Sequence, residues 1–91
     1  MTDKQKELAR HALGLPNKFN MTYRNHFCVD KGNADYAEWE DLVAKGLATR
    51  TSGGQNWVGD FFYLTLDGAR AALLSNEHLS PEDARKMRST A

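Results

Sequence analysis

The sequence has one cysteine, Cys28, and two prolines among its 91 residues. A single cysteine excludes an intrachain disulfide and a zinc site built from cysteines, and it is typical of a reducing compartment. No apolar run approaches the ~18 residues that are needed to span a bilayer, and the first residues lack the apolar core of a signal peptide. We therefore expect a cytoplasmic protein with no membrane segment.

Net charge is also absent, because twelve Lys and Arg residues balance twelve Asp and Glu residues. Dedicated nucleic-acid binders usually carry a basic excess or a basic stripe. The charges are unevenly distributed: residues 1–33 hold six cations and three acids (+3), residues 34–60 hold two and five (−3), and residues 61–91 hold four of each. The basic and the acidic parts of the chain are therefore different pieces of the fold.

Low-complexity tracts and internal repeats are missing as well, which argues against a disordered chain or a solenoid. The composition, 41% hydrophobic and 10% aromatic, is sufficient for one small core. We expect a principal domain over residues 1–78, followed by a short C-terminal helix and tail over residues 79–91.

Local signals predict a first helix that begins after Thr2. Thr2 and Gln5 form a capping-box pattern, and Gly14 followed by Pro16 ends the helix.

Residues 17–33 favour two interpretations. Apolar residues at mostly odd positions indicate an extended segment, whereas a helix over residues 19–26 would bring Phe19 and Tyr23 onto one face. We expect a short helix followed by an extended stretch.

Residues 35–50, DYAEWEDLVAKGLATR, predict an amphipathic helix that is capped by Asn33, ends at Gly46 and runs into a strand. The face expected to turn to the core carries Tyr36, Trp39, Leu42, Val43 and Leu47. The opposite arc carries Ala34, Ala37, Glu38, Asp41, Ala44 and Lys45.

The second half of the chain predicts a hairpin and two helices. Strands LATRT (47–51) and FFYLT (61–65) flank a glycine-bearing loop. Thr65 can cap the next helix, and Ser80 followed by Pro81 is a strong start for the last one, which buries little beyond Met87.

This order of elements is that of a winged-helix domain, and the stretch LVAKGLATR…GGQNWVGDFFYLTLDGARAAL is similar to the helix-to-wing region of MarR- and PadR-like proteins. The matching residues are Leu42, Gly46, Leu47, Arg50, Gly53, Leu64, Thr65, Gly68 and Leu73. The whole chain also resembles short uncharacterised phage and prophage proteins that carry YRNH, here residues 23–26, ahead of the same pattern. The resemblance implies an α+β fold: a small winged helix-turn-helix with three N-terminal helical or extended elements, a β-hairpin wing and C-terminal helices.

The helix predicted within residues 35–50, the third element of this pattern, lacks the outward side chains of a DNA-binding recognition helix. A winged-helix regulator presents Arg, Lys, Asn, Gln, Ser or Thr to the major groove, whereas this helix presents alanines and acids, and its wing, residues 51–60, has no Lys or Arg. We therefore expect a non-enzymatic protein that binds another protein through the acidic third helix and the wing. The expected partner-binding residues are Asp35, Ala37, Glu38, Asp41, Lys45, Arg50 and Trp57.

Such a helix can mimic the charge of nucleic acid. With the phage-like resemblance, this implies an inhibitor of a host nucleic-acid-binding complex, such as an anti-CRISPR or another anti-defence protein. Formation of a homodimer through the same surface is an open alternative.

A second hypothesis is a DNA-binding transcription regulator that uses its basic N-terminal region, as a monomer or as a dimer. Its candidate residues are Lys4, Lys6, Arg10, Lys18 and Arg24, which could equally be ordinary solvated positions.

An enzyme has little support in the sequence. The three histidines are widely spaced, and His26 near Cys28 lacks the orienting third group of a nucleophile–base pair. We expect a buried thiol beside a hydrogen-bonded histidine, and no catalytic residue, cofactor or metal. Within YRNH, Asn25 and His26 can anchor the turn before the third helix by hydrogen bonds from their side chains to the backbone. The alternative is a polar patch beside the acidic helix, in which Arg24 pairs with Glu38 or Asp41.

Overall fold

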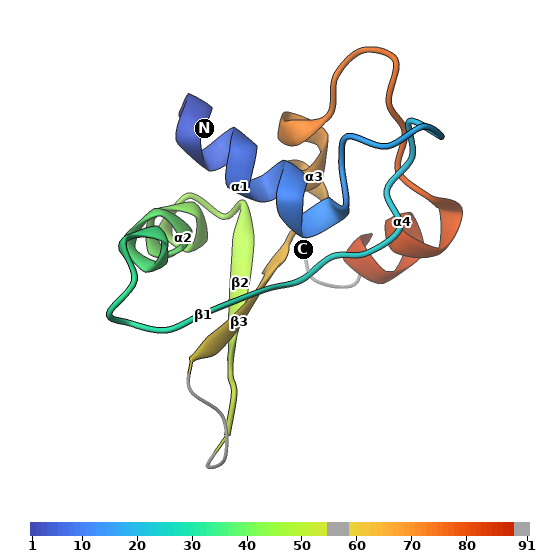
Figure 1. The fold of residues 1–91 in the computed structure, drawn as a ribbon. Coiled ribbons are helices and arrows are strands. Elements are labelled where there is room, and N and C mark those ends of the chain that lie inside the picture. The colour runs from blue at the N-terminus through green and yellow to red at the C-terminus, as the bar shows by residue number, and fades with distance from the viewer. Residues whose placement is uncertain (55–58, 89–91) are drawn as a thin grey trace.

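The computed structural model describes residues 1–54 and 59–88. In chain order the elements are α1 (Asp3–Leu13), β1 (Phe27–Val29), α2 (Ala34–Ala44), β2 (Ala48–Ser52), β3 (Asp60–Leu64), α3 (Leu66–Ala72) and α4 (Pro81–Arg88) (Figure 1). The described residues thus form four helices and one three-stranded antiparallel sheet with strand order β1-β3-β2. The predicted α+β class is confirmed.

The predicted hairpin is formed by β2 and β3, with Ala48 opposite Leu64 and Ser52 opposite Asp60. β1 pairs with the other side of β3, where Phe27 lies opposite Phe62. Figure 1 shows that β2 and β3 extend beyond the helices.

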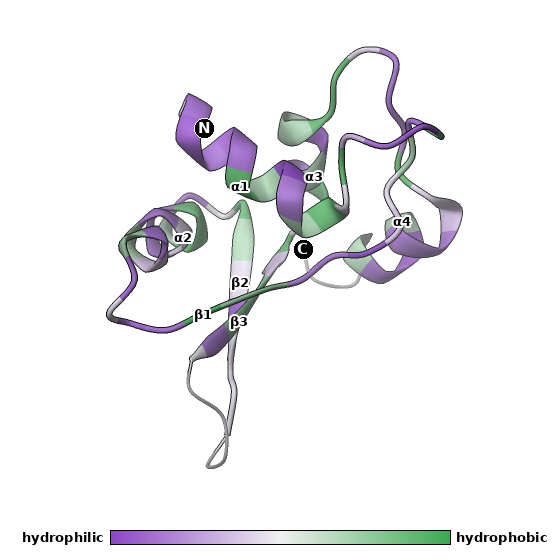
Figure 2. Cartoon of the chain, in the orientation of Figure 1, coloured by the Kyte–Doolittle hydropathy of each residue, from purple (hydrophilic) through white to green (hydrophobic). Residues whose placement is uncertain are grey.

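The core lies where α1, α2 and α3 meet the sheet. Trp39 of α2 is fully buried, and its ring centroid lies 5.5 Å from that of Phe62 and 5.3 Å from that of Phe27. In Figure 2 the first half of α1 is hydrophilic, whereas its second half mixes hydrophilic with hydrophobic residues. The hydrophobic ones, Leu8, Ala9, Ala12 and Leu13, are buried. Tyr36, Trp39 and Leu42 are buried as predicted.

Val43 was predicted to lie in the core, and this is wrong: its side chain is 36% exposed. Val43 shares the angular position of Tyr36, seven residues earlier, but it lies in the last turn of α2. There it lines an open groove between α2 and β2. Leu47 is only partly buried for a related reason, since it lies in the connection after the helix.

Residues 17–26, which we call the strap, contain no helix, so the predicted short helix over 19–26 is wrong. The strap instead supplies donors to the last carbonyl groups of α1, which have no partner within their own helix. The backbone N–H of Tyr23 donates to the oxygen of Leu13 (3.3 Å) and that of His26 to Ala12 (3.2 Å). The guanidinium of Arg24 donates to the oxygen of His11 at 2.7 and 3.2 Å. The expected pairing of Arg24 with Glu38 or Asp41 is therefore also wrong.

Asn25 extends the sheet by its side chain. Its Nδ2 donates to the carbonyl oxygen of Leu64 (3.0 Å), and the N–H of Leu64 donates to its Oδ1 (2.9 Å). The amide thus takes the place that another backbone residue would have on β3. Asn25 anchors β3 rather than the predicted turn before α2, and His26 is held by its backbone N–H, which donates to Ala12.

The base of the hairpin is closed by four residues of the winged-helix-like pattern, Gly46, Leu47, Thr65 and Gly68, which we call the wing-base junction. The N–H of Thr65 donates to the oxygen of Leu47 (3.0 Å), and its hydroxyl donates to the oxygen of Gly46 (2.9 Å). The same hydroxyl caps α3 by accepting from the N–H of Gly68 (3.2 Å). The motif therefore fixes where α3 leaves the sheet.

A buried ion pair ties α1 to the connection between α3 and α4. Arg10 and Glu77 form a bidentate pair, with Nη2 of Arg10 at 2.7 Å from Oε2 of Glu77, and their side chains are 14% and 2% exposed. The N–H of Leu74 also donates to Glu77 (2.8 Å). The hydrogen bonds from Arg10, more than any other influence, lower the pKa of Glu77. α4 packs on the same core through Met87, which is 2% exposed.

Candidate protein-binding surface

The predicted acidic arc of α2 faces α1. Nε2 of the buried Gln5 donates to Asp41 (2.7 Å) and to Glu38 (3.3 Å), and Nζ of Lys4 lies 3.7 Å from Asp35. Lys45 pairs with Asp41 at 2.8 Å. Hydrogen bonds from Lys45 and then from Gln5 lower the pKa of Asp41. Three of the four α2 acids are thus held by contacts within the chain.

Glu40 differs from these acids. Its side chain is exposed and makes no hydrogen bond or ion pair with any residue in the described ranges 1–54 and 59–88. The exposed residues of α2 and its C-cap are Ala34, Ala37, Glu40, Asp41, Val43, Ala44 and Lys45. Among them only Lys45 carries a side-chain hydrogen-bond donor, and that ammonium group is engaged by Asp41.

A groove of about 610 Å³ separates the second half of α2 from β2. We call it the α2–β2 groove, and it is lined by Glu40, Val43, Ala48, Thr49, Arg50 and Phe62. The lining is apolar at Val43, Ala48 and Phe62, whereas Glu40 and Arg50 carry opposite charges. The sequence did not predict Val43 as a groove residue, because its position on the helix placed it in the core. It did not single out Glu40, because a count of charges does not show which acids form ion pairs or hydrogen bonds within the chain.

Arg50 is fixed at the base of the wing. Its Nη1 donates to the hydroxyl of Tyr36 (3.1 Å) and lies 4.0 Å from Oδ2 of Asp60, to which that hydroxyl donates at 2.6 Å. The hydrogen bond to Asp60 is the largest influence that raises the pKa of Tyr36, and the hydrogen bond to Tyr36 is the largest that raises the pKa of Arg50. The charge of Arg50 is therefore largely balanced inside the chain.

Two of the five basic residues proposed for nucleic-acid binding are engaged by acids of the same chain. Lys4 pairs with Asp35, and Arg10 lies in the buried pair with Glu77. Lys18 and Arg24 lie on the strap, each over an aromatic ring, Phe19 and Tyr23 respectively, at 5.2 and 5.3 Å from the ring centroid.

Lys6 and Arg10 line one pocket beside α1, together with the acids Asp3 and Glu7. Trp57, which was predicted to bind a partner, lies outside the described residues.

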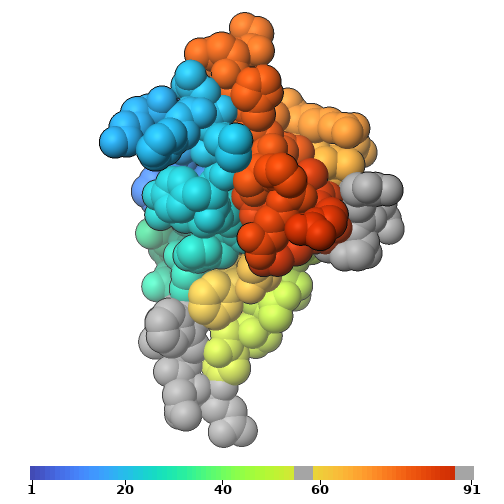
Figure 3. Space-filling view, turned by 90° about the vertical axis from the view of Figure 1, so that its right-hand side faces the viewer, coloured from blue at the N-terminus to red at the C-terminus, as the bar shows by residue number. Residues whose placement is uncertain are grey.

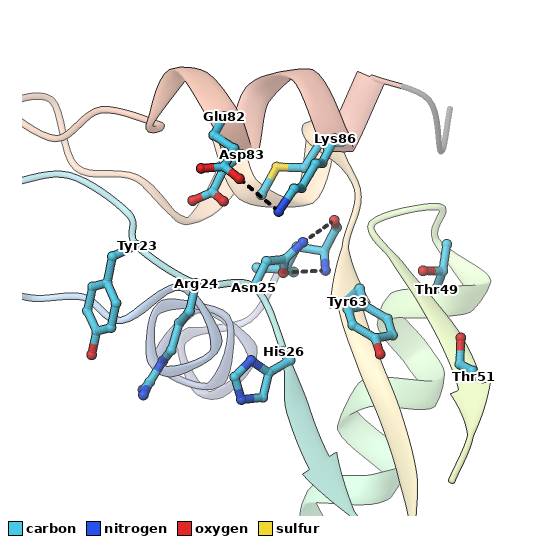
Figure 4. A pocket seen from close by; sticks show the side chains of 12 residues that line it. Tyr23, Arg24, Asn25, His26, Thr49, Thr51, Tyr63, Glu82, Asp83 and Lys86 are labelled. Carbon is cyan, nitrogen blue, oxygen red and sulfur yellow. Dashed lines mark hydrogen bonds and ion pairs between the residues drawn. The ribbon is translucent and has the colours of Figure 1, made fainter. Parts of the chain in front are cut away.

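A second groove lies on the other side of the hairpin. Figure 3 shows the strap and α4 side by side above β3 and β2. Between them is a space of about 570 Å³ that Thr49, Thr51 and Tyr63 line from the strands and Glu82, Asp83 and Lys86 line from α4 (Figure 4). Much of its polar lining is engaged, since Lys86 pairs with Glu82 (3.2 Å) and Asp83 accepts from the hydroxyl of Thr22 (2.8 Å).

The expected buried thiol is wrong, because Cys28 is exposed. The exposure of Cys28 follows from the geometry of β1. Phe27 and Val29 turn toward the core, so His26 and Cys28, at the alternate positions, face outward. Within residues 1–54 and 59–88 no group of three His, Cys, Asp or Glu side chains could hold a metal ion.

No helix of the described chain is long and apolar enough to cross a membrane. The chain matches no protein-family model, and comparisons with curated proteins and with solved structures also find no match.

Proposed function

We propose that this chain is a winged-helix-type domain that binds another protein, and does not read duplex DNA, through α2 and the wing hairpin. One observation carries the proposal: the single side-chain donor exposed on α2, Lys45, is already bound to Asp41. Direct readout of base edges needs free donors and acceptors such as Arg, Asn or Gln on this helix. Ala37 and Ala44 offer none.

The winged-helix assignment is supported by the order of α1, β1, α2 and the hairpin, and by the wing-base junction. One part of that fold is replaced. In a helix-turn-helix the first helix crosses the DNA backbone, whereas this chain has the irregular strap and β1 between α1 and α2. This difference also favours a binding mode other than duplex reading.

The exposed residues of α2 suit a protein partner. Ala37 and Ala44 are small and exposed on either side of Glu40, so a partner can approach the helix closely. Glu40 supplies an exposed negative charge, which gives such an interface specificity and electrostatic steering. The resemblance to phage and prophage proteins makes a host nucleic-acid-binding complex the first class of partner to test, with this chain as its inhibitor.

Ala44→Arg tests this surface, because it puts a long charged side chain on an exposed position without touching the core. Ala71→Arg, on an exposed position of α3, is the matched control with the same change of charge and volume. We expect nuclease-treated lysate of the host cells to yield one set of proteins with the wild type and Ala71→Arg, and to lose it with Ala44→Arg. An identical set with all three would contradict the assignment of α2 as the interface.

DNA binding is tested separately with a labelled random duplex of about 20 base pairs at low salt, where phosphate contacts are strongest. We expect no saturable change in fluorescence anisotropy up to tens of micromolar protein. A saturable change that added salt reverses would favour the transcription regulator instead. Light scattering coupled to size exclusion gives the mass in solution and tests the homodimer.

A further inference from the structure

The edge of β2 that faces away from β3 is open in the described residues. β2 pairs with β3 alone, since the strand order is β1-β3-β2. The N–H of Thr65 donates to the oxygen of Leu47, which fixes the alternation of the ladder. In an antiparallel pair every second residue directs its N–H and C=O to the partner strand. Thr49 and Thr51 therefore face β3, whereas Arg50 and Ser52 direct their backbone groups outward.

The open edge borders the α2–β2 groove. Arg50, Thr51 and Ser52 are exposed along the strand, and the groove next to them is lined by Val43 of α2 and Phe62 of β3. A row of backbone donors and acceptors with a two-residue repeat matches one kind of ligand, an extended peptide that adds a strand. Side chains at alternate positions of such a peptide would enter the groove.

We propose that the protein partner contributes an extended segment that pairs with the free edge of β2. Its backbone bonds to Arg50 and Ser52, and an apolar side chain lies against Val43. A Lys or Arg on the same face of the segment pairs with Glu40, the α2 acid that forms no hydrogen bond or ion pair within the described residues. This inference rests on the proposed function and names the conformation and chemistry of the partner at that surface.

A second copy of this chain is a poorer occupant. In a two-fold symmetric pairing the same patch meets itself, so β2 would lie beside its own copy with Arg50 near the centre of both strands. Like charges directly opposite each other on paired strands are destabilising. A segment of another protein can place an uncharged residue opposite Arg50 and its Lys or Arg beside Glu40.

The probe is a fluorescein-labelled dodecapeptide, Val-Thr-Lys-Thr repeated three times, which as a strand presents valine and lysine in turn on one face. It is titrated onto the 15N-labelled protein. We expect saturable binding with amide shifts centred on Arg50 and Ser52. The matched control peptide carries N-methyl groups on every second residue, which removes pairing N–H groups and leaves the side chains in place. We expect the control to bind about tenfold more weakly or not at all.

Two pairs of variants test the edge and the charge. Ser52→Pro removes an outward N–H at a position where an edge strand tolerates proline, and Ser52→Ala keeps that N–H. We expect about a tenfold loss of peptide affinity with Ser52→Pro and none with Ser52→Ala. Glu40→Lys should weaken binding about threefold to tenfold, and Glu40→Gln less.

No saturable binding up to about 1 mM peptide, shifts confined to the strap and α4, or equal binding by Ser52→Pro would each overturn the proposal. A concentration-dependent dimer that Ser52→Pro abolishes would assign the edge to a second copy instead. If the captured partner is lost from Ala44→Arg but retained by Ser52→Pro, the proposed function stands and strand addition is wrong.

Discussion

A Cβ atom on Gly68 would lie 1.9 Å from the carbonyl oxygen of Leu47, so α3 approaches the base of the wing as closely as a backbone can. The same carbonyl oxygen accepts a hydrogen bond from the N–H of Thr65 (3.0 Å). This contact explains why a glycine stands three residues after a threonine in this stretch. The wing-base junction therefore sets the angle of the hairpin relative to α3.

Gly68→Ala is expected to destabilise the protein by about 3 kcal/mol or to prevent folding, because the methyl group meets rigid backbone. Urea unfolding followed by circular dichroism measures the loss. Ala71→Gly, on the exposed side of the same helix, is the control and should cost only about 1 kcal/mol. Equal midpoints for Gly68→Ala and the wild type would contradict the contact with Leu47.

Asn25→Asp keeps the shape of the side chain but removes the donor to the oxygen of Leu64. We expect a loss of about 1–3 kcal/mol at neutral pH, since a partly buried carbonyl loses its partner and a carboxylate faces it. Asn76→Asp, at an exposed position, adds the same charge and should be nearly neutral. A comparable stability of both variants would show that Asn25 does not extend the sheet.

The buried pair of Arg10 and Glu77 predicts a loss of stability in acid. The pKa of Glu77 is lowered in the folded state, so its contribution is fully present above the unfolded value of about 4.3. That contribution falls as the pH drops through the lower folded value. Glu77→Gln should cost about 3 kcal/mol at pH 7 and should show a flatter stability curve below pH ~4. Parallel curves for the two proteins in that range would contradict this role.

Tyr36 is predicted to ionise late. Its hydroxyl donates to Asp60, which raises the pKa of the phenol above its ordinary value of 10.0. The contribution to stability is therefore complete below pH 10 and is lost as the pH rises through the folded value. Ultraviolet titration should show a late phase from Tyr36, and Tyr36→Phe should abolish it. A late phase that persists in Tyr36→Phe would assign it to another tyrosine.

Hydrogen exchange of the free protein tests the alternation along β2. The N–H groups of Thr49 and Thr51 point to β3 and should exchange slowly, whereas those of Arg50 and Ser52 should exchange quickly. Uniform protection of all four would contradict the open edge from which strand addition is inferred.

The parts of the fold that short-range signals determine could be predicted from the sequence. The capping box of Thr2 and Gln5, the left-handed Gly14 at the end of α1 and the Thr65 cap of α3 are all confirmed. Each depends on groups within four residues of one another. The hairpin was also predicted, because glycines separate two strands of the expected length.

The parts that were missed depend on distant residues. The strap is extended because Arg24 and Tyr23 bond to the end of α1, and because Asn25 bonds to Leu64, 39 residues away. Helical periodicity gave Val43 the correct angle on α2, but it could not show that the last turn of α2 borders an open groove. Charge counting could not show that Gln5 reaches Asp41, 36 residues later. The α2–β2 groove is formed by residues that are distant in the sequence. Of the residues that line it, Arg50 alone was among the predicted site residues.

The most direct test of the account compares hydrogen–deuterium exchange of the chain alone and with its captured partner. Binding through α2 and the wing predicts new protection over residues 37–52, with the strap and α4 unchanged. Protection that appears in the strap and α4 while residues 37–52 stay as they were would contradict the central claim.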